Sequence, residues 1–520
     1  MKAVTISGSQ RLRGIGGAVF LASIFLVCVT WNRGHVLVPQ ADGGTLVVLA
    51  DGDCQARLQR AALVAAHPGM IIRTHEFENY PAGTVPHTTA PMDYLIAGLS
   101  VMVQPLDRAG AWISPLLGLF TVLFLFFWAR GLELRPRWPM LLLFCISPAL
   151  THAFALGRPD HQSLLAALTV VALASNWAWV KTSKPSWAWI SGGAWGLALW
   201  VSWFEPLILL ATQEITRGLV LRGKAWPKTW RQALLLTAGI ALGAWAVEGL
   251  RSPWPSTEVR ALFPRWAAMI GELSGTDPRA MFTWTGWLLA PAPLLLAWDY
   301  FRRRDPLSLI VLLMLAVVTA LTAWQARWSP WQASVFCVAL PWILAPLRKG
   351  WLVWTAFIIS LWPVAEAWEL RLFPSQAEAS RREELVAEAA LLAQTAKFLH
   401  DQPRAGVLAP WWISPALARM SGQPMVGGTS HQSLPGSAET ARFFLSNDDT
   451  LAQVILQKRM VGYVVTDAPE RIIPTSSALL GATAPETPMI TRLARSRNVP
   501  PFLEPVFANR FFRVYKVRHE

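Results

Sequence analysis

The stretch GAWISPLLGLFTVLFLFFWA, residues 110–129, carries no charged side chain and is long enough to cross a bilayer as one helix. Further apolar segments recur along the chain at 14–31, 137–155, 163–180, 187–203, 205–216, 232–248, 284–300, 307–323, 331–347 and 351–367. Several of them are close to the lower limit of about 17 residues for a crossing helix, and 205–216 is the shortest. We therefore predict a polytopic α-helical membrane protein with about eleven transmembrane helices.

The composition agrees with a membrane protein. Of 520 residues, 53% are hydrophobic and 15% are charged, whereas soluble proteins carry about 25% charged residues. The 29 tryptophans also favour a membrane, because tryptophan is enriched at the membrane interface. A net charge of +14 would suggest nucleic acid in a soluble protein. Here basic loops explain the charge, so we expect membrane lipids and lipid-linked phosphates as partners, and no nucleic acid.

Loop charges orient the chain. The loops 130–137, 181–184, 217–231, 301–305 and 347–350 are rich in lysine and arginine, which places them in the cytoplasm. The outer face then receives residues 32–109, 156–162, 249–283, 324–330 and everything after 368. Counting the apolar stretch 91–105 as a crossing would reverse this order. We therefore predict that this stretch is a helix lying in the interface.

The chain changes character after residue 369. Residues 375–401 form an Ala- and Glu-rich helical pattern, and AGVLAP (405–410) and VGYVVTD (461–467) are typical of buried strands. A helical segment (449–459) lies between them, and NRFFRVYKV (509–517) predicts a last strand. We expect two domains: a transmembrane domain over 1–369, with outer loops 32–109 and 249–283, and a soluble α/β domain over 370–520.

Several acidic residues fall on the predicted outer side. Asp51 and Asp53 lie in one loop, Asp160 and Glu258 come from two others, and His161 follows Asp160. Mg²⁺ and Mn²⁺ prefer carboxylate oxygens and often share them with substrate phosphates, so these groups could form an open metal site. The alternative is that they are solvated loop residues.

One arginine breaks the charge pattern of the loops. Arg327 stands alone at the outer end of a predicted span, where it could bind a phosphate in bidentate fashion or extend to the interface between tryptophans.

These segments together resemble the catalytic subunit of oligosaccharyltransferase, of the prokaryotic single-subunit type. That subunit belongs to the GT-C membrane glycosyltransferases. The resemblance rests on DGDCQAR (51–57), the Pro-rich stretch 77–99, ALGRPDHQSLLAALTV (155–170), PSTEVRALF (255–263) and LAPWWISPALARMSGQPMVGGTSHQS (408–433). Their order along the chain, and their common predicted side, make the resemblance specific.

The resemblance implies roles for individual residues. Asp51, assisted by Asp53, and Asp160 would bind a divalent metal, and His161 would substitute where Gln162 departs from the family pattern. Glu258 would contact metal and acceptor, and Arg327 and Arg57 the donor phosphate. Trp411 and Trp412 match tryptophans that help to hold the acceptor. Ile413 stands where the family has aspartate, which leaves Ser414 as the nearest polar group.

The implied function is an inverting, metal-dependent transferase using Mg or Mn. It would move a sugar or oligosaccharide from a polyprenyl phosphate or diphosphate to a protein, on the periplasmic or extracytoplasmic face of a prokaryotic plasma membrane. Because of Ile413, a second function stays open: another GT-C transferase with a lipid, polysaccharide or hydroxyl acceptor. Because of Gln162, a transferase that has lost its activity also stays open. A transporter of lipid-linked sugars would call for charges buried inside spans.

Overall fold

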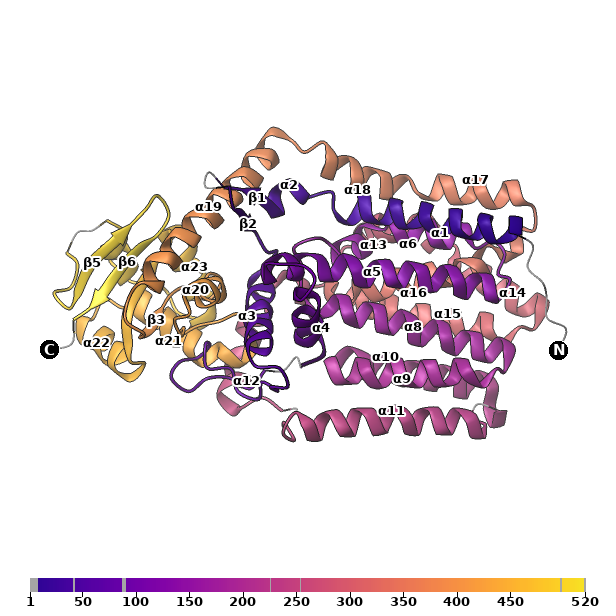
Figure 1. The fold of residues 1–520 in the computed structure, drawn as a ribbon, viewed down its shortest axis with the longest axis horizontal. Helices are drawn as coiled ribbons and strands as arrows, with labels where there is room; N and C mark the ends of the chain where they lie inside the picture. Colours follow the sequence, from indigo (N-terminus) through magenta and orange to yellow (C-terminus); the bar gives the residue numbers. More distant parts are fainter. Residues whose placement is uncertain are drawn as a thin grey trace.

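The computed structural model describes residues 8–40, 43–86, 90–224, 226–252, 254–495 and 498–518. Residues 87–89 of the Pro-rich stretch lie outside the described residues. Long helices lie side by side in one half of the molecule, and a smaller domain with a β-sheet occupies the other end (Figure 1).

The helical half follows the apolar segments of the sequence, and every predicted span overlaps a helix. Its helices are α1 (Gly8–Val29), α5 (Leu106–Gly131), α6 (Trp138–Ile146), α7 (Pro148–Ala153), α8 (His161–Thr182), α9 (Pro185–Val201), α10 (Phe204–Leu221), α11 (Lys228–Val247), α14 (Ala292–Arg303), α15 (Pro306–Trp324), α16 (Ser329–Leu344), α17 (Gly350–Ser360) and α18 (Trp362–Leu372). Among them α8 and α16 are the most deeply buried candidate spans, so they form the centre of the bundle.

The predicted number of spans is not confirmed. Within the described ranges, five helical segments are long and apolar enough to cross a membrane: α5, α8, α11, α15 and Ala326–Leu347. The pair α17 and α18, bent by 43°, would be a sixth. Other predicted spans fall short because their helices are interrupted or brief, whereas α10 has 18 residues but carries three charged side chains, Glu205, Glu214 and Arg217. The segment 137–155 breaks into α6 and α7 where Pro148 follows Ser147, and α9 has 17 residues.

The outer segments form short elements between the bundle and the C-terminal domain. They are α2 (Arg33–Val36), β1 (Leu37–Pro39), β2 (Thr45–Val47), α3 (Gly52–Ala66), α4 (Ala90–Ser100), α12 (Thr257–Ala267) and η2 (Gly271–Leu273). The last helix of the long loop, α13 (Pro278–Thr285), packs instead against α16 and α18 of the bundle. The stretch predicted to lie in the interface contains α4, which packs against α3 and α5. In Figure 1, α3 and α4 stand across the end of the bundle.

The C-terminal part is an α/β structure, as predicted. Its sheet has the order β3 (Gly406–Leu408), β4 (Val461–Thr466), β6 (Arg513–Val517) and β5 (Leu503–Ala508), with β3 parallel to β4 and the other pairs antiparallel. The helices are α19 (Gln376–His400), α20 (Ser414–Ser421), α21 (Leu434–Leu445), α22 (Asp449–Lys458), α23 (Pro469–Leu480) and α24 (Met489–Ala494). The predicted strands and α22 are confirmed.

Alternating side chains build a core on each side of this sheet. Val464 and Tyr515 pack into one apolar cluster, whereas Val465 and Val514 pack into another. This alternation follows from the two-residue repeat of a strand. The edge strand β5 was not predicted, because Pro505 interrupts its pattern; the ladder shifts register there, as is typical of proline in an edge strand.

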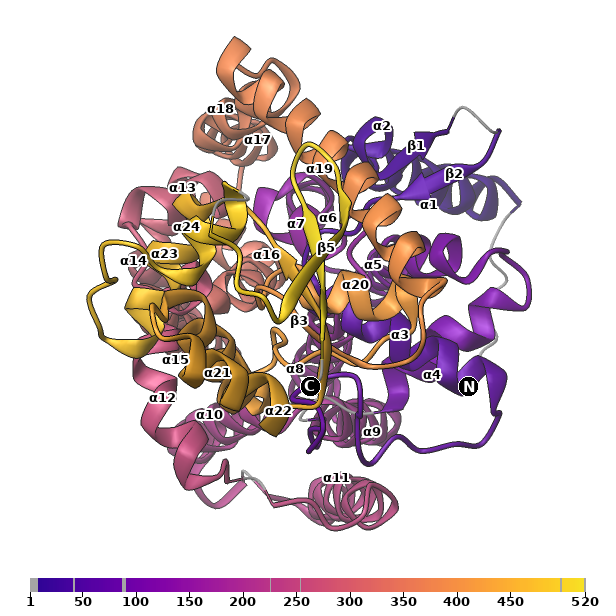
Figure 2. The same cartoon turned by 90° about the vertical axis from the view of Figure 1, so that its left-hand side faces the viewer.

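The two halves meet at α3 and α20, which pack against each other. Figure 2 shows α19 crossing the face of the molecule that the C-terminal domain covers. On the membrane side, the first and second outer loops are joined by a hydrogen bond from Ala50 N to Gly157 O (3.0 Å). This bond sets residues 51–53 beside residues 158–160.

Candidate functional site

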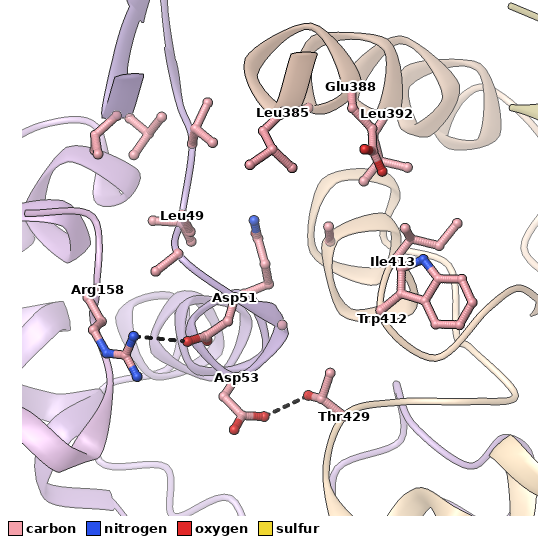
Figure 3. Close-up of a pocket in the computed structure, with 18 of the residues that line it drawn as sticks. Leu49, Asp51, Asp53, Arg158, Leu385, Glu388, Leu392, Trp412, Ile413 and Thr429 are labelled. Carbon is pink, nitrogen blue, oxygen red and sulfur yellow. Dashed lines mark hydrogen bonds and ion pairs between the residues drawn. The ribbon is translucent and has the colours of Figure 1, made fainter. Parts of the chain in front are cut away.

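A cavity of about 700 Å³ separates the first outer loop from the C-terminal domain. One wall consists of residues 46–53 together with Arg158, Asp160 and Gln162. The facing wall consists of α19, residues 411–413 and Thr429 (Figure 3). The long outer loop adds Trp266, Ile270 and Glu272. Segments distant in the sequence therefore converge on one space.

Asp51 stands at the start of α3. Its backbone is extended, and its side chain caps the helix by accepting a hydrogen bond from Cys54 N (2.9 Å). This is the usual role of an aspartate at a helix N-terminus. Its other oxygen lies 3.6 Å from Arg158 Nη1, and its side chain stays 38% exposed. Asp51 therefore holds the helix and still faces the cavity.

Asp53 extends from the first turn of α3 into the cavity (Figure 3). It accepts a hydrogen bond of 2.7 Å from Thr429 Oγ1 of the facing wall. Although the side chain of Asp53 is exposed to the cavity, partial desolvation by the surrounding protein, followed by the charges of Asp51 and Asp160, raises its pKa to about 7. A carboxyl group with such a pKa can exchange a proton near neutral pH.

Asp160 is buried just before α8 and belongs to a charged cluster. Its carboxylate lies 2.6 Å from His161 Nδ1 and 3.9 Å from Arg158 Nη2. Although burial alone would raise it, the pKa of Asp160 is held well below its usual range by His161 and Arg158. Asp160 therefore stays ionised. His161 faces a separate small polar pocket and not the large cavity.

The arrangement does not form the metal centre expected from the resemblance. Across the residues that the structure describes, no three His, Cys, Asp or Glu side chains lie close enough together to hold a metal ion. The expected ligands already have other partners. Arg158 lies against Asp51 and Asp160, Thr429 donates to Asp53, and His161 Nδ1 lies against Asp160. The residues as placed do not fit a divalent cation.

The long outer loop brings a different acid to the cavity from the one predicted. Glu258 is exposed on α12 and does not line the cavity, because its neighbour Val259 is the residue that packs into the apolar cluster below. Glu272 on η2 lines the cavity instead, and Gln162 Nε2 donates to its carboxylate (3.4 Å). Of these two glutamates, Glu272 lies at the cavity, whereas the predicted Glu258 lies outside it.

Two predicted phosphate-binding arginines are engaged with acids in the structure. Arg327 pairs with the buried Glu205 at the start of α10 and does not line the large cavity. Arg57 is buried in α3 and donates to Asp93 of α4 (2.8 Å). Sequence analysis missed Glu205, although an acid inside an apolar run is itself a signal of a buried polar contact.

Trp411 and Trp412 lie on the wall of the cavity that faces Asp51. Trp412 Nε1 donates to Asp467 (3.0 Å), which fixes its ring. Ile413 lines the cavity, so this part of the wall is apolar. Ser414 is fully buried and its hydroxyl donates to the carbonyl groups of residues 409 and 410. It therefore does not offer a polar group to an acceptor.

No protein family matches the sequence, and no curated protein matches it. Solved structures do match in fold. The oligosaccharyltransferase of Archaeoglobus fulgidus, tethered to an acceptor peptide with the NVT sequon, has a TM-score of 0.64 at 15% identity, covering 97% of this chain and 74% of that one. The same enzyme with zinc and sulfate has a TM-score of 0.59 at 16% identity, covering 96% of this chain and 73% of that one.

ArnT from Cupriavidus metallidurans, bound to undecaprenyl phosphate, is also similar. Its TM-score is 0.54 at 13% identity, and the match covers 98% of each chain. The chain therefore shares its fold with these proteins.

Proposed function

We propose that this chain is an integral membrane glycosyltransferase that uses a polyprenyl phosphate or diphosphate donor. The observation that carries the proposal is the cavity of about 700 Å³, in which Asp51 and Asp53 lie on one wall and Trp412 on the facing wall. Supporting it, the proteins of the same fold include one solved with undecaprenyl phosphate and one solved with an acceptor peptide. The first candidate acceptor is a protein, bound on the outer face of the membrane.

The proposed chemistry is a single displacement. The acceptor nitrogen or oxygen attacks the anomeric carbon, the bond from that carbon to the donor phosphate oxygen breaks, and the configuration inverts. The leaving phosphate keeps the electron pair of that bond. Asp53 takes the acceptor proton, because it is the carboxylate that extends into the cavity while Arg158 lies against Asp51 and Asp160.

Arg327 is the proposed contact of the leaving phosphate. A guanidinium group binds phosphate oxygens in pairs and stabilises the charge that develops when the donor bond breaks. Because Arg327 pairs with Glu205 in the structure, donor binding would exchange the carboxylate for the phosphate. Trp411 and Trp412 would form the wall against which the acceptor is held.

A second candidate acceptor is a lipid, a polysaccharide or a protein hydroxyl. The observation that favours it is the apolar wall at Ile413, where the resembling family carries an aspartate, together with the buried hydroxyl of Ser414. Position 413 therefore offers no carboxylate to an acceptor that needs one there.

The test compares glycopeptides and lipid-linked glycans by mass spectrometry in cells that carry the native chain, Asp51→Asn or Glu258→Gln. Expression of each protein is measured first. We expect Asp51→Asn to remove glycans from peptides and to accumulate them on the lipid, whereas Glu258→Gln, outside the cavity, behaves like the native chain. Unchanged peptides with a sugar lost from a lipid or polysaccharide would support the second candidate. No change in any glycan would refute the proposed function.

A further inference from the structure

Arg158 lies in the second outer loop, two positions before Asp160. It immediately follows Gly157, whose backbone has a φ of +80° and whose carbonyl accepts the hydrogen bond from Ala50. The hydrogen bond between the two outer loops therefore positions the guanidinium of Arg158 beside Asp51.

The side chain of Arg158 is held on several sides. Its Nη1 lies 3.6 Å from Asp51 Oδ2, and its Nη2 lies 3.9 Å from Asp160 Oδ2. Nη1 also lies 2.9 Å from His152 Nε2, to which the guanidinium donates. Its backbone carbonyl accepts a hydrogen bond of 2.5 Å from Ser114 Oγ. With only 13% of the side chain exposed, Arg158 is part of the wall of the cavity.

The carboxylates of this wall surround Arg158 and stabilise its positive charge. Burial alone would lower the pKa of Arg158, but the carboxylates of Asp51 and Asp160 raise it above its ordinary value. Glu272 contributes in the same direction from the long outer loop. A divalent cation placed on Asp51 and Asp160 would meet a fixed positive charge within about 4 Å of the same oxygens. Like charges at that distance repel strongly inside a protein.

We propose that the guanidinium of Arg158 is the resident cation of this site and stands between Asp51 and Asp160 in place of a divalent metal. The chain then needs no divalent metal to keep the two carboxylates together and oriented. The role of Arg158 is a positioning role, because it acts through Asp51 and Asp160. The part of the inference that concerns turnover rests on the proposed function.

The experiment uses the purified full-length chain, stripped of metal with a chelator, and Mn²⁺ as the probe. Free Mn²⁺ gives an electron paramagnetic resonance signal that is lost on binding. We expect the native chain and Arg158→Lys to leave this signal unchanged. We expect Arg158→Ala to remove a stoichiometric amount of Mn²⁺ and the double variant Arg158→Ala/Asp51→Asn to remove none. Arg382→Ala, another arginine of the cavity that pairs with Glu378, should behave like the native chain.

Stoichiometric Mn²⁺ binding by the native chain that Asp51→Asn abolishes would overturn the proposal. So would an Arg158→Ala variant that is folded and binds no Mn²⁺. If Arg158→Ala does not fold, the native chain and Arg158→Lys still decide the question.

Turnover supplies the second measurement. Transfer by the native chain should persist in excess chelator, and activity lost in Arg158→Ala should return in part with Mn²⁺ or free guanidinium. Transfer that stops in chelator and resumes with Mn²⁺ would overturn the inference. A native chain that transfers no sugar would instead refute the proposed function, while the Mn²⁺ titration would still decide the role of Arg158.

Discussion

The buried ion pair between Arg57 and Asp93 gives the sharpest test of how this site is built. Arg57 Nη1 lies 2.8 Å from Asp93 Oδ1, and the two side chains are 2% and 4% exposed. Arg60 Nε lies 3.5 Å from the other oxygen of Asp93. Removing one partner of a buried pair typically costs about 3–5 kcal/mol, because the remaining charge is left without its partner.

The geometry orders the variants within that range. Arg57→Met leaves Asp93 with Arg60, so we expect a loss near 3 kcal/mol in the free energy of unfolding. Asp93→Asn takes a partner from both arginines, so we expect a loss near 5 kcal/mol. The double variant should lose about as much as Asp93→Asn alone, because both changes break the same contact.

The assay is denaturant-induced unfolding of the purified protein in mixed micelles, with the KM for a lipid-linked donor measured on folded Arg57→Met. We expect that KM to equal the native value. Additive losses, or an unchanged stability accompanied by a raised donor KM, would refute the reasoning. The latter outcome would support the phosphate-binding role predicted for Arg57 from the sequence.

Three further predictions concern the cavity and the C-terminal core. Because Asp53 must be ionised to take a proton and its pKa is about 7, kcat/KM should rise as pH rises through 7, and a pH–rate profile of Asp53→Asn should lose this limb. Glu272→Gln, at the wall of the cavity, should lower kcat/KM at least about tenfold, which corresponds to about 1.4 kcal/mol of lost transition-state stabilisation. In the same kinetic assay, Glu258→Gln should match the native enzyme. Gly436→Ala would set a Cβ 1.8 Å from Val426 O, so a thermal melt should show a loss of about 3 kcal/mol or more in the free energy of unfolding. An unchanged melting temperature would contradict this close approach of Gly436 to the backbone of Val426.

The apolar segments predicted the helices because burial and membrane insertion both select for the same residues. They did not predict the number of crossings, because continuity of a helix depends on single residues such as Pro148. The strands around Val464 and Val514 were predictable from their short apolar runs, whereas the proline-containing edge strand was not.

The candidate site was predictable where charge and loop position were sufficient. Asp51, Asp53 and Asp160 belong to one wall of the cavity, in agreement with the common side that the loop charges predict for them. The position of Glu258 depends on which face of α12 packs inward, and the sequence alone did not settle it. Arg158 carried a readable signal, since it lies two positions before Asp160.

Because α3 packs against α20, the cavity can form only after α20 has been synthesised. About 350 residues of chain separate Ala66 from Ser414, the end of one helix and the start of the other. At a ribosomal rate of roughly 5–20 residues per second, Asp51 and Asp53 wait about 20–70 s after synthesis before the opposite wall of the cavity exists. A nascent or prematurely terminated chain therefore exposes its acidic loop without an enclosed cavity. The cavity is complete only when the C-terminal domain has left the ribosome and packed against α3.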